Sequence, residues 1–221
     1  MNSELKKRFF TSIALLSLLA GMYFYSFMMI ISLIIIAIIT WIEFYSLISK
    51  IFKKKSTHDK FFNLLYKSIS LLCLFSLVYY IFLIESNYPH LKIYLIYSIL
   101  VAVMSDIGGL VFGKTFKGRK LTKISPNKTI SGSIGSFFFA LFLIPIFYDS
   151  LFEHKFLIIV LITILISLTS QLGDIFISLI KRKAKVKNTS DLLPGHGGIL
   201  DRVDGIIFSI PIGVVLFIFL I

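Results

Sequence analysis

The chain has 221 residues, 57% of them hydrophobic, and a mean hydropathy of +0.92. Soluble domains are about 45–50% apolar, so this composition excludes an ordinary soluble protein and leaves little chain for a soluble domain. The net charge of +12 would suggest nucleic acid in a soluble protein. Here the basic residues gather in loops between apolar runs, which indicates a membrane protein with no nucleic-acid partner.

The apolar runs predict about seven membrane-spanning helices in an all-α, polytopic transmembrane protein. A spanning helix needs about 20 mostly apolar residues, so the run over 9–48 is long enough for two, with a turn expected near Gly21. Further spans are predicted over 64–84, 93–111, 130–147, 156–180 and 205–221. We expect one integral-membrane domain over 1–221, with N-terminal spans in 9–111 and the catalytic part in about 105–221.

The basic residues predict how the helices are oriented. Of the 23 lysines and arginines, 20 lie in the N-terminal segment or in the loops after the second, fourth and sixth spans. With seven spans, these four segments fall on one side of the bilayer. Positive loops face the cytoplasm. The sequence therefore predicts a protein of the cell inner or plasma membrane with its N-terminus and polar loops in the cytoplasm.

Three carboxylates lie inside apolar runs, where a charge costs roughly 2.5–3.5 kcal/mol at a helix centre. Glu43 is close to Lys50 and the membrane surface, so we expect it to pair there or to reach the interface. Asp106 and Asp174 lie about one or two turns from the cytoplasmic ends of their predicted spans and have glycine neighbours, which permit close helix approach. We interpret both as candidate site residues, the alternative being a polar contact between helices.

Asp201 and Asp204 are three residues apart, so they share one face if a helix begins there. Together with Asp174 they could form an oxygen site for Mg²⁺, which is usually held by one or two carboxylates plus substrate phosphates. The alternative is an ordinary helix start, where aspartate is favoured by capping and by the helix dipole.

Two polar loops could bind phosphate. The first contains a turn over 194–198 with three glycines, whose backbone N–H groups can approach a phosphate closely. Lys181 and Arg182 precede it and could neutralise phosphate charge, although positive loops alone would also explain them. The second loop, over 113–135, alternates basic residues with glycine, serine and threonine, as would suit a nucleoside triphosphate or an anionic lipid head group.

At these residues the sequence resembles the bacterial phosphatidate cytidylyltransferase (CDP-diacylglycerol synthase) family. The resemblance covers about 105–221 and is most specific in the stretch P-G-H-G-G-x-x-D-R-x-D, which is read here over 194–204. The residues that match the two family motifs include Asp106, Ser125, Lys128, Thr129, Asp174, Ser178, Lys181, Arg182, Gly195, His196, Gly197, Gly198, Asp201, Arg202 and Asp204. Two positions differ, with Asn188 replacing an aspartate and Ser131 a glutamate.

The resemblance implies transfer of CMP from CTP to phosphatidate, giving CDP-diacylglycerol and pyrophosphate. It implies catalytic roles for Asp174, Asp201, Asp204, Lys181 and Arg182, and Mg²⁺, with room for a second metal ion, at the three aspartates. It also implies a homodimer. The residues expected to contact substrate are Asp106, Ser125, Lys128, Thr129, Ser178, Gly195, His196, Gly197, Gly198 and Arg202.

Two other functions are consistent with parts of the pattern. A CTP-dependent lipid kinase, acting on a polyprenol or a similar alcohol, would transfer the γ-phosphoryl group instead. A non-enzymatic transporter or lipid-binding protein would use Asp106 and Asp174 as an ion relay, and would be expected to carry its carboxylates near the bilayer midplane. The acids gather at the cytoplasmic ends of the predicted spans, which disfavours the transporter.

Overall fold

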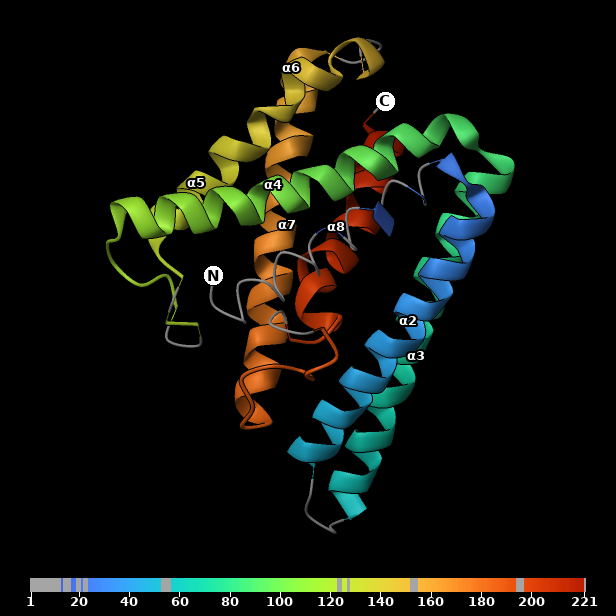
Figure 1. Cartoon of the computed structure of the whole chain (residues 1–221), viewed down its shortest axis with the longest axis vertical. Coiled ribbons are helices and arrows are strands. Elements are labelled where there is room, and N and C mark those ends of the chain that lie inside the picture. The colour runs from blue at the N-terminus through green and yellow to red at the C-terminus, as the bar shows by residue number, and fades with distance from the viewer. Residues whose placement is uncertain are drawn as a thin grey trace. The chain divides into compact units, whose positions relative to one another are not determined.

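The computed structural model describes residues 13, 17–18, 21, 24–52, 57–122, 125–126, 128–151, 155–193 and 197–220. Figure 1 shows that helices dominate this part of the chain, which confirms the predicted all-α class. The elements are α2 (Ser26–Ile51), α3 (Thr57–Asn87), η1 (Pro89–Leu91), α4 (Lys92–Phe116), α5 (Ile130–Leu141), α6 (Leu143–Phe147), η2 (Asp149–Leu151), α7 (Phe156–Lys183) and α8 (Leu200–Phe219).

Six segments of the described chain are long and apolar enough to cross a membrane, and they coincide with the last six predicted spans. This is a multi-pass membrane protein. The first predicted span lies mostly outside the described residues. Several helices extend beyond the apolar runs: α3 begins at Thr57, α4 continues to Phe116 and α8 begins at Leu200. Hydropathy misses these turns because a helix satisfies its own backbone groups while its polar side chains reach water.

The chain divides into two compact units, one of Met1–Asn87 with Ile180–Val203 and one of Tyr88–Leu179 with Asp204–Ile221. In the first unit, α2 and α3 lie side by side and run antiparallel (Figure 1). Ser26 Oγ at the start of α2 donates a 2.5 Å hydrogen bond to Glu85 near the end of α3. At the opposite end of the pair, the rings of Phe52 and Phe62 stack with centroids 6.4 Å apart.

The second unit has a packed core to which α4, α5, α6, α7 and α8 all contribute. Tyr97 of α4 is fully buried there and its hydroxyl lies 2.6 Å from Thr163 Oγ1 of α7. A second buried pair joins the same two helices, with Ser105 Oγ 2.9 Å from Ser167 Oγ. Satisfied polar pairs of this kind fix the register of two otherwise apolar helices.

Glycines bring α4 and α5 close together. A Cβ added to Gly108 would overlap the carbonyl oxygen of Gly135, and a Cβ added to Gly135 would lie 2.7 Å from the Gly108 carbonyl oxygen. Gly132 approaches Gly109 in the same way. Small residues allow such contacts between membrane helices. The glycines beside Asp106 therefore do permit close helix approach, as predicted from the sequence.

Candidate active site

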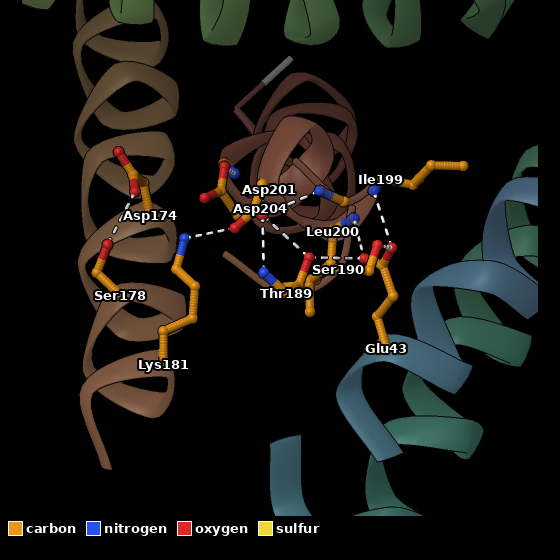
Figure 2. Close-up of polar contacts among 12 residues, drawn as sticks. Glu43, Asp174, Ser178, Lys181, Thr189, Ser190, Ile199, Leu200, Asp201 and Asp204 are labelled. Carbon is orange, nitrogen blue, oxygen red and sulfur yellow. Dashed lines mark hydrogen bonds and ion pairs between the residues drawn. The ribbon is translucent and has the colours of Figure 1, made fainter. Parts of the chain in front are cut away.

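Asp201 fixes the loop between α7 and α8 in the first unit (Figure 2). Its Oδ2 accepts hydrogen bonds from Thr189 N at 2.9 Å, Thr189 Oγ1 at 3.0 Å and Gly198 N at 3.1 Å. Its Oδ1 accepts from Lys181 Nζ at 2.6 Å. Asp201 lies in the first turn of α8, where a negative charge is favoured by the helix dipole.

The Lys181–Asp201 ion pair is largely shielded from water, since the two side chains are 13% and 10% exposed. Lys181 comes from the last turn of α7. A pair buried to this degree depends on both partners, because removing one leaves an uncompensated charge. The pair thus joins the end of α7 to the start of α8 and places a lysine and an aspartate side by side.

Glu43 of α2 holds the same loop from the opposite side (Figure 2), and the sequence did not predict this role. The residue is only 5% exposed and accepts four hydrogen bonds. Thr189 Oγ1 donates at 2.9 Å and Ser190 Oγ at 2.5 Å. The amides of Ile199 and Leu200 donate at 3.1 and 2.8 Å.

We expected Glu43 to pair near Lys50 or to reach the membrane surface, and it does pair, but with hydroxyl and amide donors of this loop. The first amides of a helix have no acceptor within the helix. The Glu43 carboxylate of α2 accepts from two amides at this point, those of Ile199 just before α8 and Leu200 at its start. It also places a negative charge at the positive end of α8. The available signal was a carboxylate inside an apolar span, which must find donors. Nothing local in the sequence identified the donors.

The two described glycines of the predicted phosphate-binding turn have tight backbone surroundings. Gly197 has a φ of +82°, and its backbone exchanges hydrogen bonds of 2.8 and 3.1 Å with Leu193. A Cβ on Gly198 would overlap Thr189 Oγ1 and the Glu43 carboxylate. The Gly197 amide donates within the loop and the Gly198 amide donates to Asp201, so both amides are engaged. Gly195 and His196 lie outside the described residues.

In the second unit, Asp174 of α7 forms an ion pair with Lys128, and Ser178 Oγ donates a long hydrogen bond of 3.3 Å to its Oδ1. Lys128 and Asp174 are about a quarter exposed, at 26% and 25%. The backbone places Lys128 through a hydrogen bond of 2.8 Å from Leu121 N to its carbonyl oxygen. The pair combines a cation that could hold phosphate with an anion that could hold a metal.

Thr129 and Asp204 are both used at helix starts. Thr129 is the N-cap of α5, and its side chain accepts from Gly132 N at 3.1 Å. Asp204 is 6% exposed, and its Oδ1 accepts from Gly205 N at 2.9 Å. A Cβ on Gly173 would lie 3.0 Å from the Asp204 carbonyl oxygen, so α7 approaches α8 closely next to Asp174.

The remaining candidate residues lie in a turn or have exposed side chains. Ser125 contributes its amide and carbonyl to the turn before Lys128. The side chains of Asp106, Arg182 and Arg202 are exposed, as is that of Asn188. Within the described ranges, no three His, Cys, Asp or Glu side chains gather into a metal site by themselves. A Mg²⁺ ion there would share its coordination with substrate phosphate, which is its usual manner of binding.

These features define a class of protein: a helical membrane protein in which lysines form ion pairs with aspartates at two places. Such pairs of a cation and an oxygen ligand are suited to phosphate chemistry. Residues 1–220 match the model of the cytidylyltransferase family, and the chain belongs to that family.

Three curated relatives illustrate the similarity, each called phosphatidate cytidylyltransferase. The protein of Staphylococcus aureus (strain COL) is 39% identical over 146 residues, which are 63% of this chain and 56% of the relative. That of Staphylococcus haemolyticus is 39% identical over 151 residues with the same coverage. That of Bacillus subtilis (strain 168) is 41% identical over 120 residues, 53% of this chain and 45% of the relative. The chain spans about half the length of the curated relatives it matches.

Proposed function

We propose that this protein transfers CMP from CTP to phosphatidate, giving CDP-diacylglycerol and pyrophosphate. Lysine–aspartate pairing in both units is the observation that carries the proposal: Lys181 with Asp201, and Lys128 with Asp174. Family membership and the names of the relatives support the same reaction. Transfer between two anionic substrates needs cations for the phosphates and an oxygen site for a metal, and both kinds of group are present.

The reaction forms one P–O bond and breaks another. A phosphate oxygen of phosphatidate attacks the α-phosphorus of CTP, while the bond from that phosphorus to the α–β bridging oxygen breaks and its electron pair leaves with pyrophosphate. Charge develops on the leaving oxygens, where positioned cations are most effective. Lys128, Lys181 and Arg182 are the residues proposed to hold these phosphates.

We propose that Asp174, Asp201 and Asp204 are the metal residues, with Asp204 assisting. Their oxygen-only donor set fits Mg²⁺. Both oxygens of Asp201 already accept hydrogen bonds, whereas Asp174 has one lysine and one long bond from a serine, so Asp174 is the more available ligand. Bound Mg²⁺ would neutralise the developing phosphate charge.

Glu43 and Asp201 are proposed to position the loop that carries the substrate-binding turn. They hold it through Thr189 and Ser190 within the loop and through the amide of Leu200 at the start of α8. Contacts of that turn with the triphosphate would fall to Gly195 and His196, because the amides of Gly197 and Gly198 are engaged within the loop. The apolar helix surfaces would admit the acyl chains from the bilayer.

The proposed orientation follows the basic residues, with the N-terminus and the loops that contain Lys128 and Lys181 in the cytoplasm, where CTP is available. The bilayer would be the cell inner or plasma membrane. A homodimer is proposed from the family resemblance.

The reverse reaction tests the proposal. Purified protein is incubated in detergent with CDP-diacylglycerol, Mg²⁺ and labelled pyrophosphate. We expect label to appear in CTP, because pyrophosphate re-forms the bond that the forward reaction breaks. A lipid kinase or a non-enzymatic lipid-binding protein would form no labelled CTP, so that result, in folded protein, would overturn the proposal.

A further inference from the structure

A cavity in the first unit is lined by residues that the proposed reaction does not use. It has a volume of about 360 Å³ and lies between α2 and α3. Its walls include Trp41 and Tyr45 from α2, Phe52 directly after α2, and Lys60, Asn63 and Lys67 from α3. Helix residues two apart do not share a face, so Trp41 and Tyr45 point away from the side of α2 on which Glu43 holds the catalytic loop.

The cavity carries two positive charges with no acidic counterpart. Among the described residues, no carboxylate forms an ion pair with Lys60 or Lys67, and Asp59, next to Lys60 in the chain, does not line the cavity. Lys67 Nζ lies 3.5 Å from the centroid of the Tyr45 ring, a cation–π contact. Because an aromatic ring has no net charge, this contact does not neutralise Lys67, and both lysine charges remain available to an anion.

Lys67 also lies within a segment that is apolar enough to span the membrane. A charged side chain there is costly unless it reaches the interface or binds a partner. The backbone of α3 at Lys67 is joined to α2, since Trp41 Nε1 donates a hydrogen bond of 3.4 Å to the Lys67 carbonyl oxygen. Tryptophan and tyrosine favour the membrane–water interface, which places the cavity at head-group depth.

The apolar part of the cavity wall continues onto the exposed surface of α3. Leu64 and Leu71 line the cavity and are 68% and 46% exposed. Residues 60, 64, 67 and 71 repeat at helical spacing, so they form one stripe in which two lysines, Lys60 and Lys67, alternate with Leu64 and Leu71. An amphipathic molecule with an anionic head and an acyl chain can use both kinds of contact, its head at the lysines and its chain against the exposed leucines.

We propose that this cavity binds an anionic phospholipid of the surrounding bilayer. Lys60 and Lys67 contact the head-group phosphate, Asn63 and Ser68 supply neutral hydrogen-bond donors, and an acyl chain lies along Leu64 and Leu71. Basic pockets between membrane helices bind such head groups, and each lysine near the surface contributes roughly fivefold to the affinity. The site is separate from the proposed CTP-dependent reaction.

Trp41 is the only tryptophan of the chain, so its fluorescence reports on this cavity alone. The protein is placed in bilayer nanodiscs that contain either brominated phosphatidylglycerol or brominated phosphatidylcholine at the same fraction, because bromine quenches tryptophan on contact. We expect phosphatidylglycerol to quench Trp41 at a severalfold lower fraction than phosphatidylcholine. Equal quenching by the two lipids would overturn the proposal.

Charge variants separate the cavity from a general surface effect. Lys60→Gln and Lys67→Gln should each weaken the preference for phosphatidylglycerol roughly fivefold. Lys50→Gln is the matched control, because Lys50 is exposed near the end of α2 and does not line the cavity. An equal loss with Lys50→Gln would assign the preference to loop charge and contradict the proposal. Lys60 is exposed, so its variant remains informative even if Lys67→Gln impairs folding.

Discussion

Glu43 and Asp201, far apart in the sequence, share one hydroxyl: Thr189 Oγ1 lies 2.9 Å from Glu43 Oε2 and 3.0 Å from Asp201 Oδ2. A hydroxyl has a single proton to donate, so it serves the two carboxylates together or in turn. Each carboxylate also accepts backbone amides at or just before the start of α8. The loop between α7 and α8 is therefore fixed by two anions in addition to its own backbone hydrogen bonds.

The first prediction concerns Glu43→Gln. The variant places an NH₂ donor where amide donors point, and loss of a buried acceptor costs about 1–3 kcal/mol. We expect the amides of Ile199 and Leu200 to exchange hydrogen for deuterium roughly ten to a hundred times faster, with a lower rate of product formation. Glu85→Gln is the matched control, since Glu85 also accepts from a serine but at the far end of the α2–α3 pair. Unchanged exchange in Glu43→Gln would contradict the positioning role.

The second prediction concerns the Lys181–Asp201 pair. Lys181→Met leaves a largely buried carboxylate without its cation, a change that costs about 3–5 kcal/mol. We expect a clear fall in the thermal unfolding temperature in detergent, and little change for the exposed neighbour in Lys183→Met.

The double variant Lys181→Met with Asp201→Asn separates structure from chemistry. Removing both charges should recover most of the lost stability, whereas activity should stay low because a phosphate-binding cation and a metal residue are both gone. Recovery of activity along with stability would mean that the pair is only structural.

The third prediction concerns Lys128. A charge-assisted hydrogen bond contributes about 1.5–3 kcal/mol, so Lys128→Gln should raise the KM for CTP at least roughly tenfold. Lys117→Gln removes an exposed lysine of the same loop and should leave KM within about twofold. Equal effects of the two variants would indicate general attraction of CTP by the basic loop rather than a contact by Lys128.

The fourth prediction concerns the metal. Asp174→Asn should raise the Mg²⁺ concentration needed for half-maximal activity and weaken Mg²⁺ binding measured by calorimetry in the presence of CTP, because one oxygen ligand loses its charge. Asp149→Asn is the control, because it removes an exposed carboxylate at η2, and it should change neither the Mg²⁺ requirement nor Mg²⁺ binding. If Asp174→Asn lowered the maximal rate with an unaltered Mg²⁺ requirement, the assignment of this residue would be wrong.

The fifth prediction concerns the contact between α4 and α5. A Cβ in Gly135→Ala would overlap the Phe112 side chain and approach the Gly108 carbonyl oxygen at 2.7 Å. Overpacking of this kind costs about 1–3 kcal/mol, so the unfolding temperature should fall. Gly113→Ala is the control from the same interface, since its nearest neighbour would be Thr129 Oγ1 at 3.2 Å. Equal tolerance of both substitutions would show that the helices can separate without loss.

Hydropathy and motifs predicted the parts of this protein that depend on local sequence. The last six spans were correct because about 20 apolar residues have few alternatives to a membrane helix. The start of α8 was predicted less well, since hydropathy placed the last span from 205 and a helix start at Asp201 was considered only as a condition for the two aspartates to share a face.

The contacts that hold the site together could not be predicted, because they join distant residues. Thr189 meets Glu43 across 146 positions of the chain, and no periodicity specifies such a partner. The Lys181–Asp201 pair was missed for another reason, since the sequence interpretation assigned the lysine to phosphate and the aspartate to a metal and did not consider that they pair with each other. The structure adds that Glu43 and Asp201 both hold the loop between α7 and α8 in place.

The most direct test of the proposed function uses CTP labelled separately at the α and γ positions, with purified protein, phosphatidate and Mg²⁺. The proposal predicts that α label moves into the lipid while γ label leaves as pyrophosphate. Gamma label on an added polyprenol, with none from α-labelled CTP in phosphatidate, would instead identify a lipid kinase. Absence of transfer from either position, in protein shown to be folded, would contradict the proposed reaction.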